Sequence, residues 1–151
     1  MANTQAMCTS FKGELLVGHH NFGTGVTRGS TAADTFKAAL YLASATLNGT
    51  TTAYSATGEV TGTGYTAGGV TVTFGTAPST SGTTAFVTPS ASISFTTVTL
   101  STAFDAVLIY NSTQSNKAVS VHTFGSQTVT AGTFTLTMPT NDASTGLIRI
   151  A

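Results

Sequence analysis

The stretch Ala106-Val107-Leu108-Ile109-Tyr110 decides the fold, because it is apolar at every position. Successive side chains of a β-strand point to opposite faces of the sheet, so this run predicts a strand that is covered on both sides. The run is also far shorter than the ~20 apolar residues that cross a bilayer. We therefore expect residues 106–110 to form a central strand of a packed domain, without a membrane span.

On both sides of this stretch, apolar and polar residues alternate with the period of two that is typical of half-buried strands. The alternating runs are residues 36–42, 70–74, 93–95, 119–123 and 134–138, and residues 147–150 close the chain. In the first run, Ala38, Leu40 and Leu42 share one face, whereas Lys37 and Tyr41 lie on the other.

Clusters of Gly, Asn, Pro and Ser separate these runs and indicate turns. Several short strands with such turns predict an all-β domain, which we expect to be a jelly-roll-like β-sandwich over residues 35–151. Its expected core consists of Leu40, Leu42, Val72, Ile93, Phe95, Val107, Ile109, Val121, Phe134, Leu136 and Ile148.

Residues 1–34 have a different pattern, which predicts a short N-terminal arm followed by a linker. Ser10 is a candidate helix cap, and apolar side chains follow at spacings close to 3.6. Two glycines weaken this helix, so the arm is expected to be helical or extended. An apolar stripe outside the β domain needs a surface to cover it. The residues that we expect to bind a partner protein are Phe11, Leu15, Leu16 and Phe22.

Charged side chains make up 7% of the chain, compared with about 25% in typical soluble domains. The 151 residues include 34 Thr and 15 Ser, and the formal net charge is zero. Five scattered basic residues give no electrostatic footprint for a nucleic acid. The N-terminus has no basic region followed by an apolar stretch, so we expect synthesis in a host cytoplasm without a signal peptide.

No motif in the chain predicts a reaction. Residues 62–67 match a dinucleotide-binding glycine pattern, but a strand rather than a helix follows them, which favours a hairpin loop. The three histidines, His19, His20 and His122, have no metal-ligand spacing, and the single Cys8 excludes a multi-cysteine zinc site. A Ser-His-Asp triad is recognised by geometry and not by the abundance of serine. We expect no enzymatic activity, no cofactor and no metal ion.

The surface composition favours permanent assembly. A neutral surface resists association poorly, and a threonine side chain loses little entropy on packing. A soluble β domain with a harmless, unusual surface is an alternative interpretation. Another is a glycan-binding module in which Tyr54, Tyr65 and Tyr110 stack on sugar rings.

Several stretches together resemble a family of small virion structural proteins of tailed bacteriophages. They are residues 35–41, 51–60, 62–70, 108–111, 116–119, 131–136 and 139–143. The resemblance implies a decoration or cement protein on the outer capsid surface, without a catalytic motif. Its expected partners are the major capsid protein and further copies of itself, as a homotrimer. A tail or head–tail joining protein is the alternative from the same source.

Overall fold

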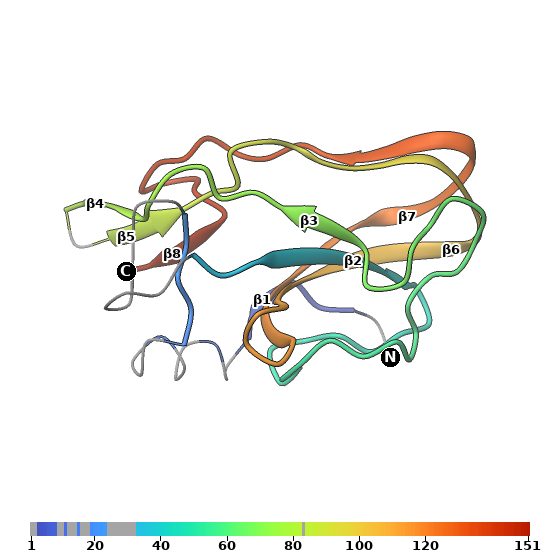
Figure 1. Ribbon diagram of the computed structural model, residues 1–151, viewed down its shortest axis with the longest axis horizontal. Helices are drawn as coiled ribbons and strands as arrows, with labels where there is room; N and C mark the ends of the chain where they lie inside the picture. The colour runs from blue at the N-terminus through green and yellow to red at the C-terminus, as the bar shows by residue number, and fades with distance from the viewer. Residues whose placement is uncertain (1–2, 9–10, 12–14, 16–18, 24–32, 83) are drawn as a thin grey trace.

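The computed structural model describes residues 3–8, 11, 15, 19–23, 33–82 and 84–151, and it is all-β with two antiparallel sheets (Figure 1). The larger sheet has the order β1-β7-β6-β2-β3 and the smaller one β4-β5-β8. The larger sheet contains β1 (Ala6–Met7), β7 (Lys117–Leu136), β6 (Ile93–Asn111), β2 (Phe36–Leu42) and β3 (Val70–Val72). The smaller sheet contains β4 (Ser79–Ser81), β5 (Thr84–Val87) and β8 (Ile148–Ile150). The all-β prediction is confirmed and a β-sandwich fits this arrangement, but the strand order does not confirm a jelly roll.

The central strand pair is β2 with β6, which run antiparallel from Phe36 opposite Asn111 to Leu40 opposite Val107. Residues 106–110 of β6 are buried at every position, as the sequence predicts. Strand β2 departs from the prediction, because Tyr41 on its supposed outer face is only 1% exposed. Tyr41 is buried because residues 54–69 lie over that face of β2 and hydrogen-bond to the strand.

Strands β6 and β7 form one long hairpin that folds back on itself at the right-hand end of Figure 1. We call residues 93–104 with 124–136 the folded-back ribbon. The register between its strands shifts at several points, and Thr97 and Ala131 have positive φ angles of 54° and 45°. Such bulges bend a strand pair. As a result Phe134, near the end of β7, packs edge-on against Phe104 with the ring centroids 5.0 Å apart.

The core between the sheets contains an aromatic cluster to which the N-terminal segment contributes. The Phe22 ring stacks on Phe36 at 4.8 Å and meets Phe74 edge-on at 5.1 Å. Strand β1 pairs with β7, with Ala6 opposite Val121. The described part of the predicted arm therefore packs on the β domain. The predicted helix lies largely outside the described residues, of which Phe11 and Leu15 have helical backbone.

The predicted core residues are buried except for Leu42, Phe134 and Leu136, which are half-buried. Phe134 and Leu136 belong to the folded-back ribbon. They lie on its β7 strand, which has no further strand beside it there, whereas Phe95, Leu100 and Phe104 on the β6 strand are buried. Within the described ranges, no helix is long and apolar enough to cross a membrane.

Candidate functional site

The most elaborate polar site is built around Glu59, whose side chain is only 6% exposed. The Tyr54 hydroxyl donates a hydrogen bond to Glu59 Oε2 at 2.6 Å, and the Tyr65 hydroxyl donates one to Oε1 at 2.7 Å. The backbone N–H of Gly68 donates to the same Oε1 at 2.8 Å. These three donors stabilise a carboxylate that burial would otherwise penalise.

The other two of the four tyrosines in the chain complete this Glu59 cluster. The Tyr110 hydroxyl donates to the carbonyl of Gly68 at 2.8 Å, and its ring stacks on Tyr54 with the centroids 4.8 Å apart. The Tyr41 hydroxyl donates to the carbonyl of Ser55 at 2.6 Å. The hydroxyls of Tyr41, Tyr65 and Tyr110 therefore join the segment 54–69 to the central strands, and Tyr54 adds its ring contact with Tyr110.

The protonation of these phenols follows from their surroundings. Burial raises the pKa of Tyr41 to about 12. Burial, followed by the hydrogen bond to Glu59, also raises the pKa values of Tyr54 and Tyr65, and burial with the nearby Glu59 charge raises that of Tyr110. Near neutral pH the four hydroxyls are protonated, so they serve as donors and do not act as phenolate nucleophiles.

The glycine-rich loop has a structural role in this cluster. Gly64, Gly68 and Gly69 have positive φ angles, a backbone conformation that residues other than glycine rarely adopt. The loop carries Tyr65 and turns the Gly68 N–H toward the carboxylate. Residues 62–67 lie in a loop, as predicted, but the segments on either side of it do not form a hairpin, because Val60 and Val70 both pair with strand β2.

Sequence reasoning missed the Glu59 cluster, because its members are scattered along the chain. One signal was available: Glu59 is the only charged residue between Lys37 and Asp105. An isolated carboxylate in so long a neutral stretch indicates a specific partner. The structure also shows that the three tyrosines of the glycan-binding alternative belong to this cluster. Tyr110 is 2% exposed, and Tyr54 covers one of its faces.

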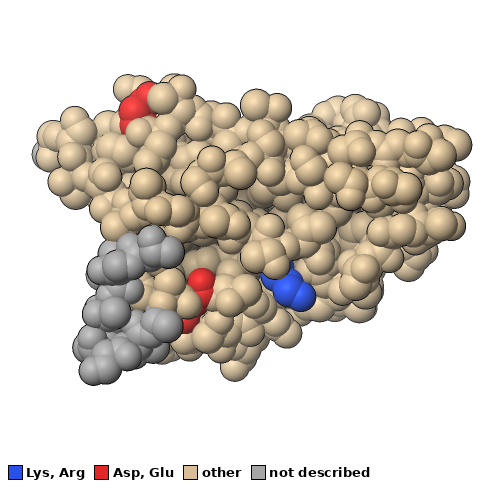
Figure 2. Space-filling model, turned by 45° about the horizontal axis from the view of Figure 1, so that its top comes forward, with Lys and Arg blue, Asp and Glu red and all other residues tan. Residues whose placement is uncertain are grey.

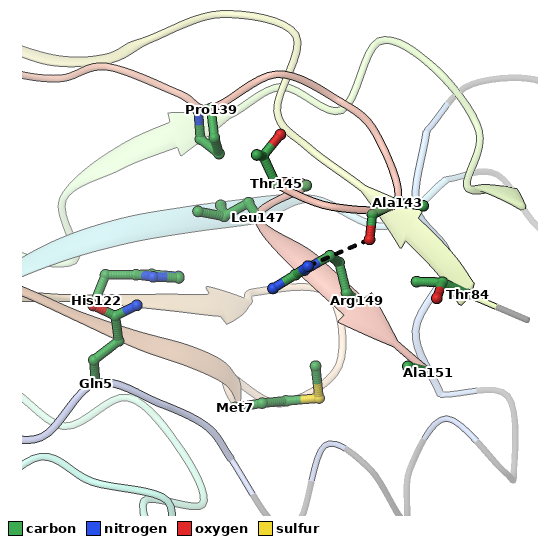
Figure 3. Close-up of a pocket in the computed structure, with 11 residues that line it drawn as sticks. Gln5, Met7, Thr84, His122, Pro139, Ala143, Thr145, Leu147, Arg149 and Ala151 are labelled. Atoms are coloured by element: carbon green, nitrogen blue, oxygen red, sulfur yellow. Dashed lines mark hydrogen bonds between the residues drawn. The ribbon is translucent and has the colours of Figure 1, made fainter. Parts of the chain in front are cut away.

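A cleft of about 520 Å³ opens between the two sheets (Figure 3). Met7 of β1 and His122 of β7 line one side, and Leu147 and Arg149 line the other. The Arg149 guanidinium donates to the backbone carbonyls of Ala143 and Ser144, which anchors it to the loop before β8. The cleft therefore combines one anchored cation with apolar and hydroxyl-bearing walls.

His122 lies in this cleft and shares a 2.8 Å hydrogen bond between its Nε2 and Ser120 Oγ. Burial lowers the pKa of His122 to about 4, so its ring is neutral near pH 7. Ser120 itself is 3% exposed and lies beneath the cleft surface. The distance between Ser120 and His122 would suit a serine nucleophile and its general base. The Ser120 hydroxyl is not exposed to the cleft, however, so a substrate bound there would not reach it.

The predicted partner-binding residues occupy different environments. Phe11 and Phe22 are 0% and 5% exposed, and the chain's own Phe36 and Phe74 provide the surface that covers Phe22. Leu15 is half-buried and lines an apolar pocket of about 220 Å³ with Ile148 and Ile150. Leu16 lies outside the described residues. Partner binding by these side chains stays a prediction.

A second buried polar group joins the N-terminal segment to the β6–β7 turn. The Asn111 Nδ2 donates to Asp34 Oδ2 at 2.8 Å and lies 3.2 Å from His20 Nδ1. The Asn111 Oδ1 accepts bonds from the backbone N–H groups of Thr113 and Gln114. Across the part of the chain that the structure describes, no three His, Cys, Asp or Glu side chains gather as metal ligands would.

Comparison with known proteins adds no relative: no family model, no curated protein and no solved structure matches the chain.

Proposed function

We propose that this chain is a structural protein of a tailed-bacteriophage particle, which binds the outer capsid shell as a decoration or cement protein. The observation that carries the proposal is a β-sandwich surface almost free of charge. Lys, Arg, Asp and Glu form only isolated spots on the face in Figure 2. Burial of Asp34 and Glu59, at 9% and 6% exposure, removes two of the five acidic residues from the surface.

The physical argument concerns desolvation and side-chain entropy. The cores of protein interfaces are depleted in Lys, Glu and Asp, whose charges are costly to desolvate. Hydroxyl groups of Thr and Ser form short hydrogen bonds with little side-chain entropy to lose. In a capsid, a permanent lattice of repeated subunits, contacts with neighbouring proteins would bury such a surface.

The mechanism that we propose is stabilisation by mass action. A protein that binds only the assembled shell shifts the assembly equilibrium toward that shell. Several simultaneous contacts multiply weak individual affinities. A specific attachment of this kind buries ~1,200–2,000 Å² in total, which a domain of this size can supply. The partners are the major capsid protein and further copies of this chain, and the homotrimer stays a prediction.

The test is the copy number of the chain in purified particles, measured by quantitative mass spectrometry against the major capsid protein. A fixed and high ratio to the shell protein supports the decoration role. A small fixed number per particle moves the chain to the tail or the head–tail joint. Absence from the particle overturns the proposal and favours a separate binding module.

A binding experiment examines the contact itself. Purified shells that lack the chain are mixed with the native protein, and co-sedimentation measures binding. Leu15→Asp is expected to weaken binding at least tenfold, because a carboxylate is costly to bury in the apolar pocket beside Ile150. Thr61→Asp adds the same charge at an exposed position and serves as the control. Equal binding of both variants would remove the arm from the interface.

A further inference from the structure

One edge of the folded-back ribbon has no neighbour among the described residues. Strand β7 pairs with β6 on one side, and on its other side β1 reaches only Ser120 and Val121. From residue 123 to residue 136, no described backbone group hydrogen-bonds to that outer side. Figure 1 shows this part of β7 running along the top of the molecule.

This edge lacks most of the features that prevent strands from associating. Natural proteins protect exposed edges with lysine, proline, a bulge or a covering loop. Residues 118–136 contain no charged residue and no proline. The bulge at Ala131 interrupts the edge, and the register with β6 shifts once more between Gly132 and Phe134, but residues 134–136 pair in continuous register with Phe95, Ser94 and Ile93. We call residues 132–136 the β7 edge.

The sequence of the β7 edge, Gly-Thr-Phe-Thr-Leu, is self-complementary in an antiparallel pair. When two copies pair about a two-fold axis at Phe134, each Thr133 faces the Thr135 of the other copy and the two Phe134 rings face each other. Thr–Thr and aromatic–aromatic pairs are among the favourable cross-strand neighbours. The edge is neutral on both faces, so no like charges oppose each other in the pair.

The packing of Phe134 also favours a second copy of this chain as the partner of the β7 edge. Its ring already contacts Phe104 and Phe124, both at centroid distances of 5.0 Å, but it remains half-buried. A two-stranded ribbon is marginally stable alone, whereas three or more strands with an apolar face are stable. Pairing with a second copy makes the ribbon four-stranded and covers the exposed side of this aromatic group.

We infer that the β7 edge is a self-association surface, at which two copies of this chain pair as antiparallel strands centred on Phe134. The biological purpose of this pairing rests on the proposed function as a virion protein, whereas the pairing itself does not. Its test uses the isolated 151-residue chain, so dimerisation without incorporation into particles would overturn the virion role alone. Incorporation of a chain that does not pair at β7 would overturn this inference alone.

The first measurement is sedimentation equilibrium of the native chain over a range of concentrations. We expect a monomer–dimer equilibrium, which differs from the homotrimer that the resemblance implies, and we expect Thr133→Lys with Thr135→Lys to weaken it at least tenfold. The control, Ser101→Lys with Thr102→Lys, adds the same charge at exposed positions of β6 and is expected to dimerise like the native chain. Circular dichroism verifies that each variant folds. A native monomer at every concentration, or a dimer that the Thr133/Thr135 variant retains, would overturn the inference.

Cross-linking tests the register independently of affinity. Thr133 of one copy lies opposite Thr135 of the other, so a mixture of Thr133→Cys and Thr135→Cys chains is expected to form interchain disulfides much faster than either chain alone. The native Cys8 is fully buried and contributes little background. Equal rates for the mixture and for the separate chains would rule out this register.

Discussion

Tyr65 donates its hydroxyl hydrogen to Glu59 Oε1 at 2.7 Å, and the same oxygen of Tyr65 accepts the backbone N–H of Leu40 at 3.0 Å. One phenol thus connects the buried carboxylate to the backbone of a central strand. Leu40 lies beyond the short pairing of β2 with β3, and Tyr65 supplies the hydrogen bond that a longer β3 would make.

Tyr65→Phe is expected to lower the free energy of unfolding by about 2–3 kcal/mol, because it leaves both a buried carboxylate and a backbone N–H without a partner. Tyr54→Phe removes only one bond to Glu59 and is expected to cost about half as much. Urea denaturation followed by circular dichroism measures both. Equal stability of Tyr65→Phe and the native chain would show that water replaces these bonds.

The tyrosines predict how stability changes at alkaline pH. The pKa of Tyr41 is 10.0 in an unfolded chain and about 12 in the fold, so the folded state binds more protons between these values. Stability is therefore complete below pH 10 and falls as the pH rises toward 12. The near-ultraviolet absorbance of phenolate should appear together with unfolding. Titration of all four phenols near pH 10 in the folded chain would contradict the buried cluster.

His122 predicts the opposite change at acidic pH. Its pKa is 6.5 when unfolded and about 4 in the fold, so the unfolded state binds more protons between these values. Stability is complete above pH 6.5 and falls by on the order of 3 kcal/mol as the pH approaches 4. The variant His122→Gln should flatten this part of the profile while other acid-sensitive groups remain. Identical slopes in the two proteins would show that His122 titrates normally.

Gly69→Ala tests whether the loop must come close to β2. Gly69 has a φ of +71°, and a Cβ there would overlap the backbone carbonyl of Ala38. We expect a loss of more than about 2 kcal/mol, since both strain and displacement of the Gly68 N–H follow. Gly125→Ala is the matched control, because a Cβ at Gly125 meets open space. Thermal unfolding measures both variants, and similar melting temperatures would refute the close approach.

Phe22→Ala separates a folding role of the N-terminal segment from a partner-binding role. The ring lies within about 5 Å of both Phe36 and Phe74, so its removal is expected to cost the isolated chain ~3–5 kcal/mol. Denaturation of the chain alone measures this cost. A stability loss below about 1 kcal/mol would mean that Phe22 contributes mainly to contacts with another protein.

The sequence by itself determined the all-β class, the central position of residues 106–110 and most of the core. These features depend on hydrophobic alternation within a few neighbouring residues, which is visible in the chain as written. The burial of Phe95, Val107 and Ile148 follows from that pattern alone. The loop at residues 62–67 was also predictable, because turn residues act locally, but the pairing of its flanking segments with β2 was not.

Only the tertiary structure decided which distant residues meet. Glu59 gathers tyrosines from positions 41 to 110, and Phe22 packs against Phe36 and Phe74, contacts that no local period encodes. The second buried face of β2 depends on a loop that folds over it. The fold-back of β6 and β7 depends on register shifts between strands, and the β7 edge is open because β1 pairs only with Ser120 and Val121. Local alternation specifies that a strand forms, whereas the pairing of strands and the covering of their faces depend on contacts between distant segments.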